Sequence, residues 1–131
     1  MRGYLLDTHI WFWYLIGSYS VPKNIIDIIN SNKPSCWYSP ISVWELSVLN
    51  RKNRIQIKGN LRDWISESLR LLPLNEAPFN KEIAITAGEM RIKQADTADY
   101  FIASTARVYD LTLLTIDMRL TELEWLKTIS E

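Results

Sequence analysis

Two short segments of this chain are apolar on both faces of the strands they are predicted to form. They are GYLLD at residues 3–7 and LTLLTID at residues 111–117. A strand that is buried on both faces needs a layer of helices on each side, as in the parallel sheets of α/β proteins. The predicted strands are also separated by helical patterns, which favours the same class. We therefore expect an α/β fold in which helices cover both faces of a short parallel sheet.

The remaining elements are expected to alternate in the same way. Further strands are predicted at residues 35–39 (SCWYS), 71–74 (LLPL) and 124–130 (EWLKTIS). Helices are predicted near residues 9–16, 21–31, 40–53, 61–72, 80–93 and 96–110. The helix at 40–53 has the clearest start, because Ser39 suits the cap and Pro40 suits the first helical position.

Composition narrows the class of protein further. The 131 residues are 47% hydrophobic, which fits one domain spanning residues 1–131 with a substantial core. The net charge is zero, so any binding of nucleic acid must rely on local patches. A single cysteine, Cys36, excludes an internal disulfide and a cysteine-rich zinc site. Neither a signal peptide nor a membrane span is predicted, and we expect a cytoplasmic protein.

Acidic residues stand where several of the predicted elements begin or end. Asp7 closes the first strand, and Asp117 closes the strand at 111–117, with Thr115 two residues before it. Asp96 and Asp99 open the helix at 96–110. Carboxyl ends of parallel strands meet at one edge of a sheet, where α/β proteins place their sites. The alternative is structural, since aspartates commonly cap helices and form turns.

Glu45 is unusual because it lies within the apolar arc of its helix. At 100° per residue its neighbours on that arc include Ile41, Trp44, Val48 and Leu49. Burying an ionised carboxylate without a partner is costly. Glu45 is therefore either a functional acid or a partly exposed residue at the edge of the stripe.

Gathered carboxylates would favour a specific chemistry. Such groups repel one another unless a cation lies between them. Oxygen ligands without histidine or cysteine suit Mg²⁺ or Mn²⁺. An acidic site that holds these ions and faces a polyanion is typical of phosphodiester hydrolysis.

Other residues carry weaker signals. His9, the only histidine, either assists proton transfer or packs at a helix start. The basic run of Arg51, Lys52 and Arg54 is a candidate RNA-binding patch, or simply a solvated helix end. The many aromatic residues, including Trp11–Tyr14 and Trp44, suit stacking on bases, a core or a partner interface.

Three segments together resemble the PIN-domain family, and most closely its VapC-type toxin ribonucleases from prokaryotic toxin–antitoxin pairs. The segments are LLDTHIWFWYL, SPISVWELSVLNRKNRIQI and DTADYFIASTARVYDLTLLTID, in the family's order and spacing. The resemblance covers essentially the whole chain. It implies an α/β/α sandwich and a metal-dependent endoribonuclease, with RNA as substrate, an antitoxin as partner and a homodimer as the expected assembly.

The resemblance also assigns roles to residues of this sequence. Asp7, Glu45 and Asp99 match the family's metal-binding acids, and Asp117 matches its fourth, more variable acid. All four are expected to be catalytic, with Mg²⁺ or Mn²⁺ held by the first three. Asp96 matches an extra acid of one subgroup, although the D-P-F-D run of that subgroup is here Asp96-Thr-Ala-Asp. Asp96, like Thr115, is expected to support the ligands without binding the ion directly.

Two alternatives belong to other classes. One is a receiver-like α/β domain, in which acids hold Mg²⁺ and one of them accepts a phosphoryl group. That plan does not account for Glu45 within a helix. The other is a non-catalytic interaction module, in which the acids are only helix caps.

Overall fold

A computed structural model describes residues 3–131. Met1 and Arg2, which the predicted domain includes, lie outside the described residues. Its centre is a five-stranded, fully parallel sheet with the order β3-β2-β1-β4-β5. The strands are β1 (Gly3–Leu6), β2 (Cys36–Tyr38), β3 (Asn75–Glu76), β4 (Leu111–Leu114) and β5 (Thr128–Ile129). The doubly apolar strands β1 and β4 lie side by side at the middle of the sheet, as their composition requires.

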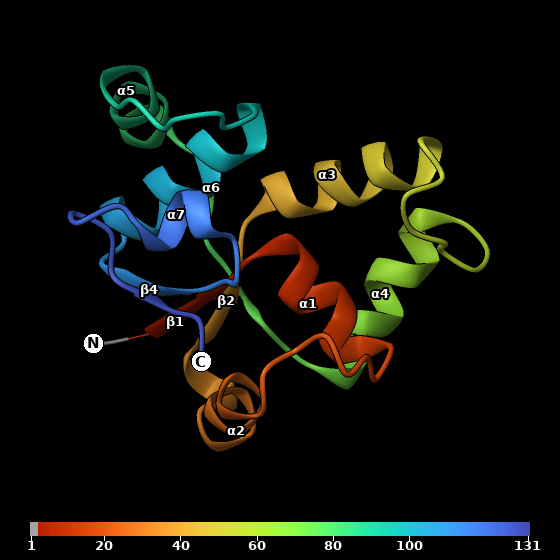
Figure 1. Ribbon diagram of the computed structural model, residues 1–131. Helices are drawn as coiled ribbons and strands as arrows, with labels where there is room; N and C mark the ends of the chain where they lie inside the picture. The colour runs from red at the N-terminus through yellow and green to blue at the C-terminus, as the bar shows by residue number, and fades with distance from the viewer. Residues whose placement is uncertain (1–2) are drawn as a thin grey trace.

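Helices cover both faces of this sheet, which makes a three-layer α/β/α sandwich (Figure 1). The helices are α1 (Thr8–Leu15), α2 (Lys23–Ser31), α3 (Pro40–Arg51), α4 (Leu61–Leu71), α5 (Lys81–Glu89), α6 (Thr97–Val108) and α7 (Met118–Thr121), with a 3-10 turn at Lys33–Ser35. In residues 3–131 no helix combines the length and the apolar character that crossing a bilayer requires.

Successive residues of β1 and β4 point to opposite faces of the sheet and pack into two separate hydrophobic cores. Leu6 and Leu114 pack with α1 and α2 on one face, where Trp11 is fully buried. Leu5 and Leu113 pack with α6 and α7 on the other face. This two-sided packing confirms the fold class expected from the apolar strands, because each face of the sheet needs its own layer.

The start of α3 also follows the sequence prediction. The Ser39 hydroxyl accepts a hydrogen bond from the Ile41 N–H at 3.0 Å, and Pro40 occupies the first helical turn. The cap fixes where the helix leaves the carboxyl end of β2. It thereby sets the position of Glu45, one and a half turns further on.

One detail of the predicted elements is wrong. The strand expected at 71–74 lies instead at Asn75–Glu76, because α4 continues through Leu71 and the parallel ladder pairs Trp37 with Asn75. Asp117, for which a cap or a turn was the structural alternative, caps the short helix α7. The predicted last strand is present as β5, at the edge of the sheet beside β4.

The strand order bears on one alternative from the sequence. Receiver-like domains have the order 2-1-3-4-5. Here β1 lies between β2 and β4, and β3 is at the edge. The receiver alternative therefore does not fit this topology.

Close packing at Gly3 gives a test of the sheet. A Cβ added there would lie 2.8 Å from Trp37 Nε1 and 2.9 Å from Leu111 Cδ2. We expect Gly3→Ala to lower the free energy of unfolding by about 1–3 kcal/mol, because the Trp37 and Leu111 side chains, and the Ser35 carbonyl 3.0 Å away, would have to move. Gly88, in α5, has no atom within 4 Å of an added Cβ. Gly88→Ala should stabilise by up to about 1 kcal/mol. Urea unfolding of both variants measures the difference, and equal effects would contradict the packing argument.

Candidate acidic active site

Asp7 and Asp117 are connected through a buried threonine at the carboxyl ends of β1 and β4. Thr115 is fully buried, and its Oγ1 donates to Asp7 Oδ2 at 2.6 Å. The same oxygen accepts a hydrogen bond from the Asp117 N–H at 3.0 Å. Since β1 and β4 are adjacent, the two acids that close them are held at one edge of the sheet.

Each of these aspartates also caps the helix that follows it. Asp7 Oδ1 accepts from the Thr8 N–H at 2.8 Å, and Asp117 Oδ1 accepts from the Arg119 N–H at 3.0 Å. Burial raises the pKa of Asp7, against the hydrogen bonds from Thr115 and Thr8 that lower it. Both aspartates therefore act as helix caps, as the structural alternative expected. Burial nevertheless leaves Asp7 in an environment that disfavours the charged form of its carboxyl group.

Glu45 projects from α3 toward the same edge. Burial raises its pKa to about 7, and the nearby charges of Asp7, Asp96 and Asp99 act in the same direction. The hydroxyl of Thr8 opposes this shift. Glu45 is half-buried and lies near three other acids. This environment favours a functional acid over a solvated residue at the edge of the helix's apolar face.

Asp96 and Asp99 open α6 as a capping box. The Asp96 side chain accepts from the Asp99 N–H, and the Asp99 side chain accepts from the Asp96 N–H, both at 3.1 Å. Asp96 is exposed, whereas Asp99 is only 7% exposed. Burial raises the pKa of Asp99 to about 6 despite its hydrogen bond. The first turn of α6 thus holds a buried carboxylate near Asp117 and Glu45.

Arg119, in α7, is a site residue that the sequence analysis missed. Its guanidinium binds both oxygens of Asp117, at 3.0 and 2.6 Å, and lies 3.1 Å from Asp99 Oδ2. It lowers the pKa of Asp117 through these bonds. In the sequence, only the D-x-R spacing after β4 could indicate the contact with Asp117. No sequence pattern indicates the contact with Asp99. Arg119 supplies the charge that lets two of these acids lie close together.

The acids expected to form a site are thus brought together, from four separate parts of the chain. Their mutual electrostatic effects connect Asp7 with Asp117, Glu45 with Asp7, and Glu45 with Asp99. Among residues 3–131, however, no group of three or more His, Cys, Asp or Glu side chains is already arranged as a metal site. Arg119 instead pairs with carboxylate oxygens of both Asp99 and Asp117.

The chemistry of the donors still fits a hard divalent cation. The gathered groups are carboxylates, and burial and mutual repulsion raise the pKa of three of them. A cation of high charge density would relieve that repulsion, and oxygen donors are the ligands that Mg²⁺ and Mn²⁺ prefer. Asp7, Glu45 and Asp99 are the residues placed to provide them.

The remaining candidates lie around this cluster. His9 is half-buried, and its ring lies 5.2 Å from that of Trp13. Its proximity lowers the pKa of Asp7 and of Asp117. Arg51, Lys52 and Arg54 are exposed at the end of α3. Of the aromatic run in α1, Trp11 and Phe12 enter the core, while Trp13 and Tyr14 stay half-buried.

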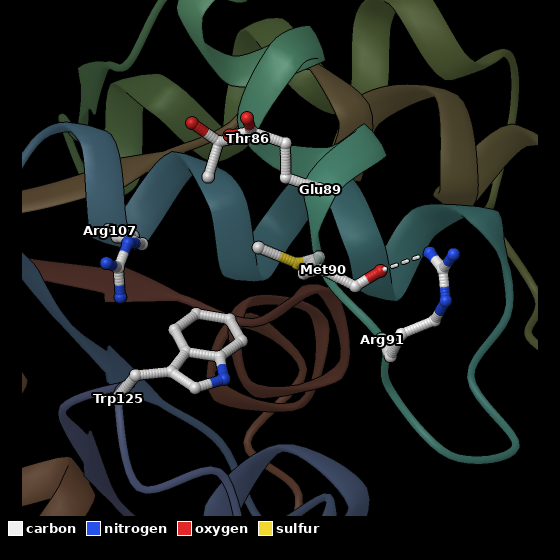
Figure 2. Close-up of a pocket in the computed structure, with 6 residues that line it drawn as sticks. All are labelled: Thr86, Glu89, Met90, Arg91, Arg107 and Trp125. Atoms are coloured by element: carbon white, nitrogen blue, oxygen red, sulfur yellow. Dashed lines mark hydrogen bonds between the residues drawn. The ribbon is translucent and has the colours of Figure 1, made fainter.

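A cavity of about 380 Å³ lies away from the acidic cluster, beside α5 and α6 (Figure 2). Arg107 lies 5.4 Å from the centre of the Trp125 ring, and at the far end Arg91 donates to the Met90 carbonyl at 3.3 Å. Its one carboxylate is Glu89, and none of the candidate acids lines it. The cavity therefore lacks the donors of the acidic cluster.

Known structures resemble the chain across nearly its whole length. VapBC from Salmonella typhimurium, bound to DNA, aligns with a TM-score of 0.74 at 18% identity and covers 98% of both chains. VapBC2 from Rickettsia felis, bound to a DNA fragment from its promoter, gives 0.73 at 20% identity with the same coverage. A toxin–antitoxin complex from Klebsiella pneumoniae gives 0.67 at 18% identity and covers 98% of this chain and 97% of that one.

At these identities the structures establish a shared fold. A search of curated proteins finds no match. The model of one protein family, the PIN domain, matches residues 4–126. That range contains all the acids described above, from Asp7 to Asp117. This chain belongs to the PIN domain family.

Proposed function

We propose that this chain is a metal-dependent endoribonuclease that acts as the toxin of a type II toxin–antitoxin pair. The observation that carries the proposal is the convergence of Asp7, Glu45 and Asp99, with Asp117 beside them, at the carboxyl edge of the sheet. Membership of the PIN domain family and the likeness to VapBC complexes support it. Nuclease activity is general among PIN-domain toxins of this kind.

The chain's own residues would divide the work as follows. Asp7, Glu45 and Asp99 would hold Mg²⁺ or Mn²⁺, and Thr115 would keep Asp7 oriented through its 2.6 Å hydrogen bond. Asp117 would add negative charge while holding Arg119 in place. When bound, the ion would activate the attacking water and stabilise the leaving oxygen of the phosphodiester.

The partners follow from the same comparison. We propose an antitoxin protein as the binding partner, since the VapBC structures and the Klebsiella pneumoniae complex pair a toxin with one. A homodimer in the cytoplasm is part of the same proposal. The half-buried aromatic side chains of α1 and the exposed Ile16 and Tyr19 after it offer apolar surface for such contacts.

The remaining alternative is a non-catalytic module, and the caps made by Asp7, Asp96 and Asp117 are the observation in its favour. Calorimetric titration with Mn²⁺ separates the two. The nuclease proposal expects Mn²⁺ to bind the wild-type chain and to bind Asp7→Asn much more weakly. A chain that binds no Mn²⁺, or that binds it equally well in both forms, would be a module.

Asp7→Asn should reduce RNA cleavage in the presence of Mg²⁺ or Mn²⁺ by at least about 100-fold. Replacing a residue that merely supports a metal ligand costs roughly 10- to 100-fold, and a ligand should cost no less. The matched control is Asp27→Asn, because Asp27 is an exposed aspartate of α2 paired with Lys23. Cleavage of a labelled RNA on denaturing gels gives the rates. Full activity of Asp7→Asn would refute the assigned site.

Glu45→Gln should stabilise the metal-free protein in a pH-dependent way. The pKa of Glu45 rises from its ordinary 4.5 to about 7 on folding, so the folded state keeps this proton longer than the unfolded chain. The wild-type protein therefore loses stability as the pH rises through that interval. The amide variant should melt several degrees higher than wild type near pH 8 and at the same temperature near pH 4, measured in EDTA.

The exposed glutamate Glu124 provides the control, and Glu124→Gln should show no such pH dependence. Added Mn²⁺ should stabilise the wild type more than Glu45→Gln. Destabilisation of Glu45→Gln at both pH values would instead give Glu45 a structural role.

A further inference from the structure

A groove separate from the cavity of Figure 2 lies beside the acidic cluster, between α3 and the start of α6. It has a volume of about 350 Å³, and its lining includes Trp44, Glu45, Lys52, Arg54 and Ala98. Glu45 therefore belongs both to the acidic cluster and to this groove. The groove has an acidic end at Glu45 and Asp96 and a basic end at Lys52 and Arg54.

The wall of this groove is an exposed aromatic surface. The Trp44 side chain is 52% exposed, although indole is among the largest apolar groups in proteins. Val48, one helical turn further along α3, and Leu49 extend the apolar wall, and Ala98 continues it on α6. A flat apolar surface of this kind can accept a planar ring.

The backbone fixes the basic end of the groove. Asn53 has φ of 58°, in the left-handed region, and the Arg54 N–H donates to the Leu49 carbonyl at 2.9 Å. This is the hydrogen-bond pattern of a Schellman motif, which folds Arg54 back along the last turn of α3. Within residues 3–131 no ion pair involves Lys52 or Arg54. Both cations are exposed and available to an anion.

We propose that this groove binds a nucleotide of single-stranded RNA, with its base against Trp44 and a phosphate beside Lys52 and Arg54. The inference rests on the proposed ribonuclease function and specifies where the strand next to the scissile bond lies. Lys52 lies seven residues beyond Glu45, about 10 Å along α3, so a strand can contact the basic end and the acidic cluster together.

Charge and shape favour RNA over another occupant. Cations near an aromatic wall match a phosphate and a base, which alternate along a single strand. Because the chain has zero net charge, this local patch would have to provide the attraction. An antitoxin segment or a second copy of the chain remains as an outcome of the test.

The test measures RNA binding without cleavage. Fluorescence anisotropy of a short, mixed-sequence, fluorescein-labelled single-stranded RNA is followed in EDTA, with Asp7→Asn as the starting protein. Adding Trp44→Ala should weaken binding by roughly 5- to 150-fold, the usual cost of losing one stacked base. Trp44→Phe should recover most of the affinity. Lys52→Ala and Arg54→Ala should each reduce the dependence of log K on log salt by about 0.7.

The matched control is Trp125→Ala, because Trp125 is also partly exposed but lines the separate cavity of Figure 2. It should leave RNA affinity unchanged. Binding of the same sequence as a duplex should not depend on Trp44, because paired bases cannot stack on it. The melting temperature of each variant shows whether it is folded. If Trp44→Ala does not fold, the comparison of Trp44→Phe with its parent still tests the groove.

The outcomes separate this inference from the function on which it rests. A wild-type chain that cleaves RNA while the Trp44 variants bind as tightly as their parent would overturn the groove alone. A wild-type chain that neither binds nor cleaves RNA would overturn both. Unchanged RNA affinity, with a loss of dimer in light scattering for Trp44→Ala, would assign the groove to a second copy. Unchanged RNA affinity with weaker antitoxin binding would assign it to the antitoxin.

Discussion

Electrostatic repulsion at one edge of the sheet is the constraint on which the rest of this structure depends. Asp7, Glu45 and Asp99 come from distant parts of the chain, and burial raises the pKa of each. A fold selected only for stability would place apolar side chains at these positions, since buried carboxylates are costly. The chain tolerates the arrangement because Thr115, the helix N-termini and Arg119 each stabilise part of the charge.

Helix capping and site formation are the same set of contacts here. Asp7, Asp96 and Asp117 each cap a helix, as the structural alternative proposed. Yet α1, α6 and α7 all begin at the carboxyl side of the sheet, so their caps converge. Capping orients each carboxylate with a backbone N–H, and the parallel sheet brings the oriented groups together. The two roles therefore do not exclude one another.

The sequence predicts most of the fold because its strongest signals are local. Apolar residues on both faces define β1 and β4, and Ser39 with Pro40 defines the start of α3. The position of β3 could not be predicted, because pairing with Trp37 rather than apolar character selects Asn75. The acids were found from their places at element ends. The contact between Arg119 and Asp99 depends on how α7 packs near α6, and no local pattern encodes it.

Arg119 has one more contact, which ties the acids to a neighbouring loop. Its Nη1 donates to the Gln94 carbonyl at 2.8 Å, and Gln94 itself has φ of 60°. One guanidinium thus joins α7, the first turn of α6 and the segment that leads into it. Moving this side chain away from its carboxylates would remove that contact and leave the segment held mainly by buried Ile92, whose backbone bonds the Tyr100 hydroxyl. The backbone at Gln94 is consequently the part of the loop most closely coupled to what neutralises the pocket.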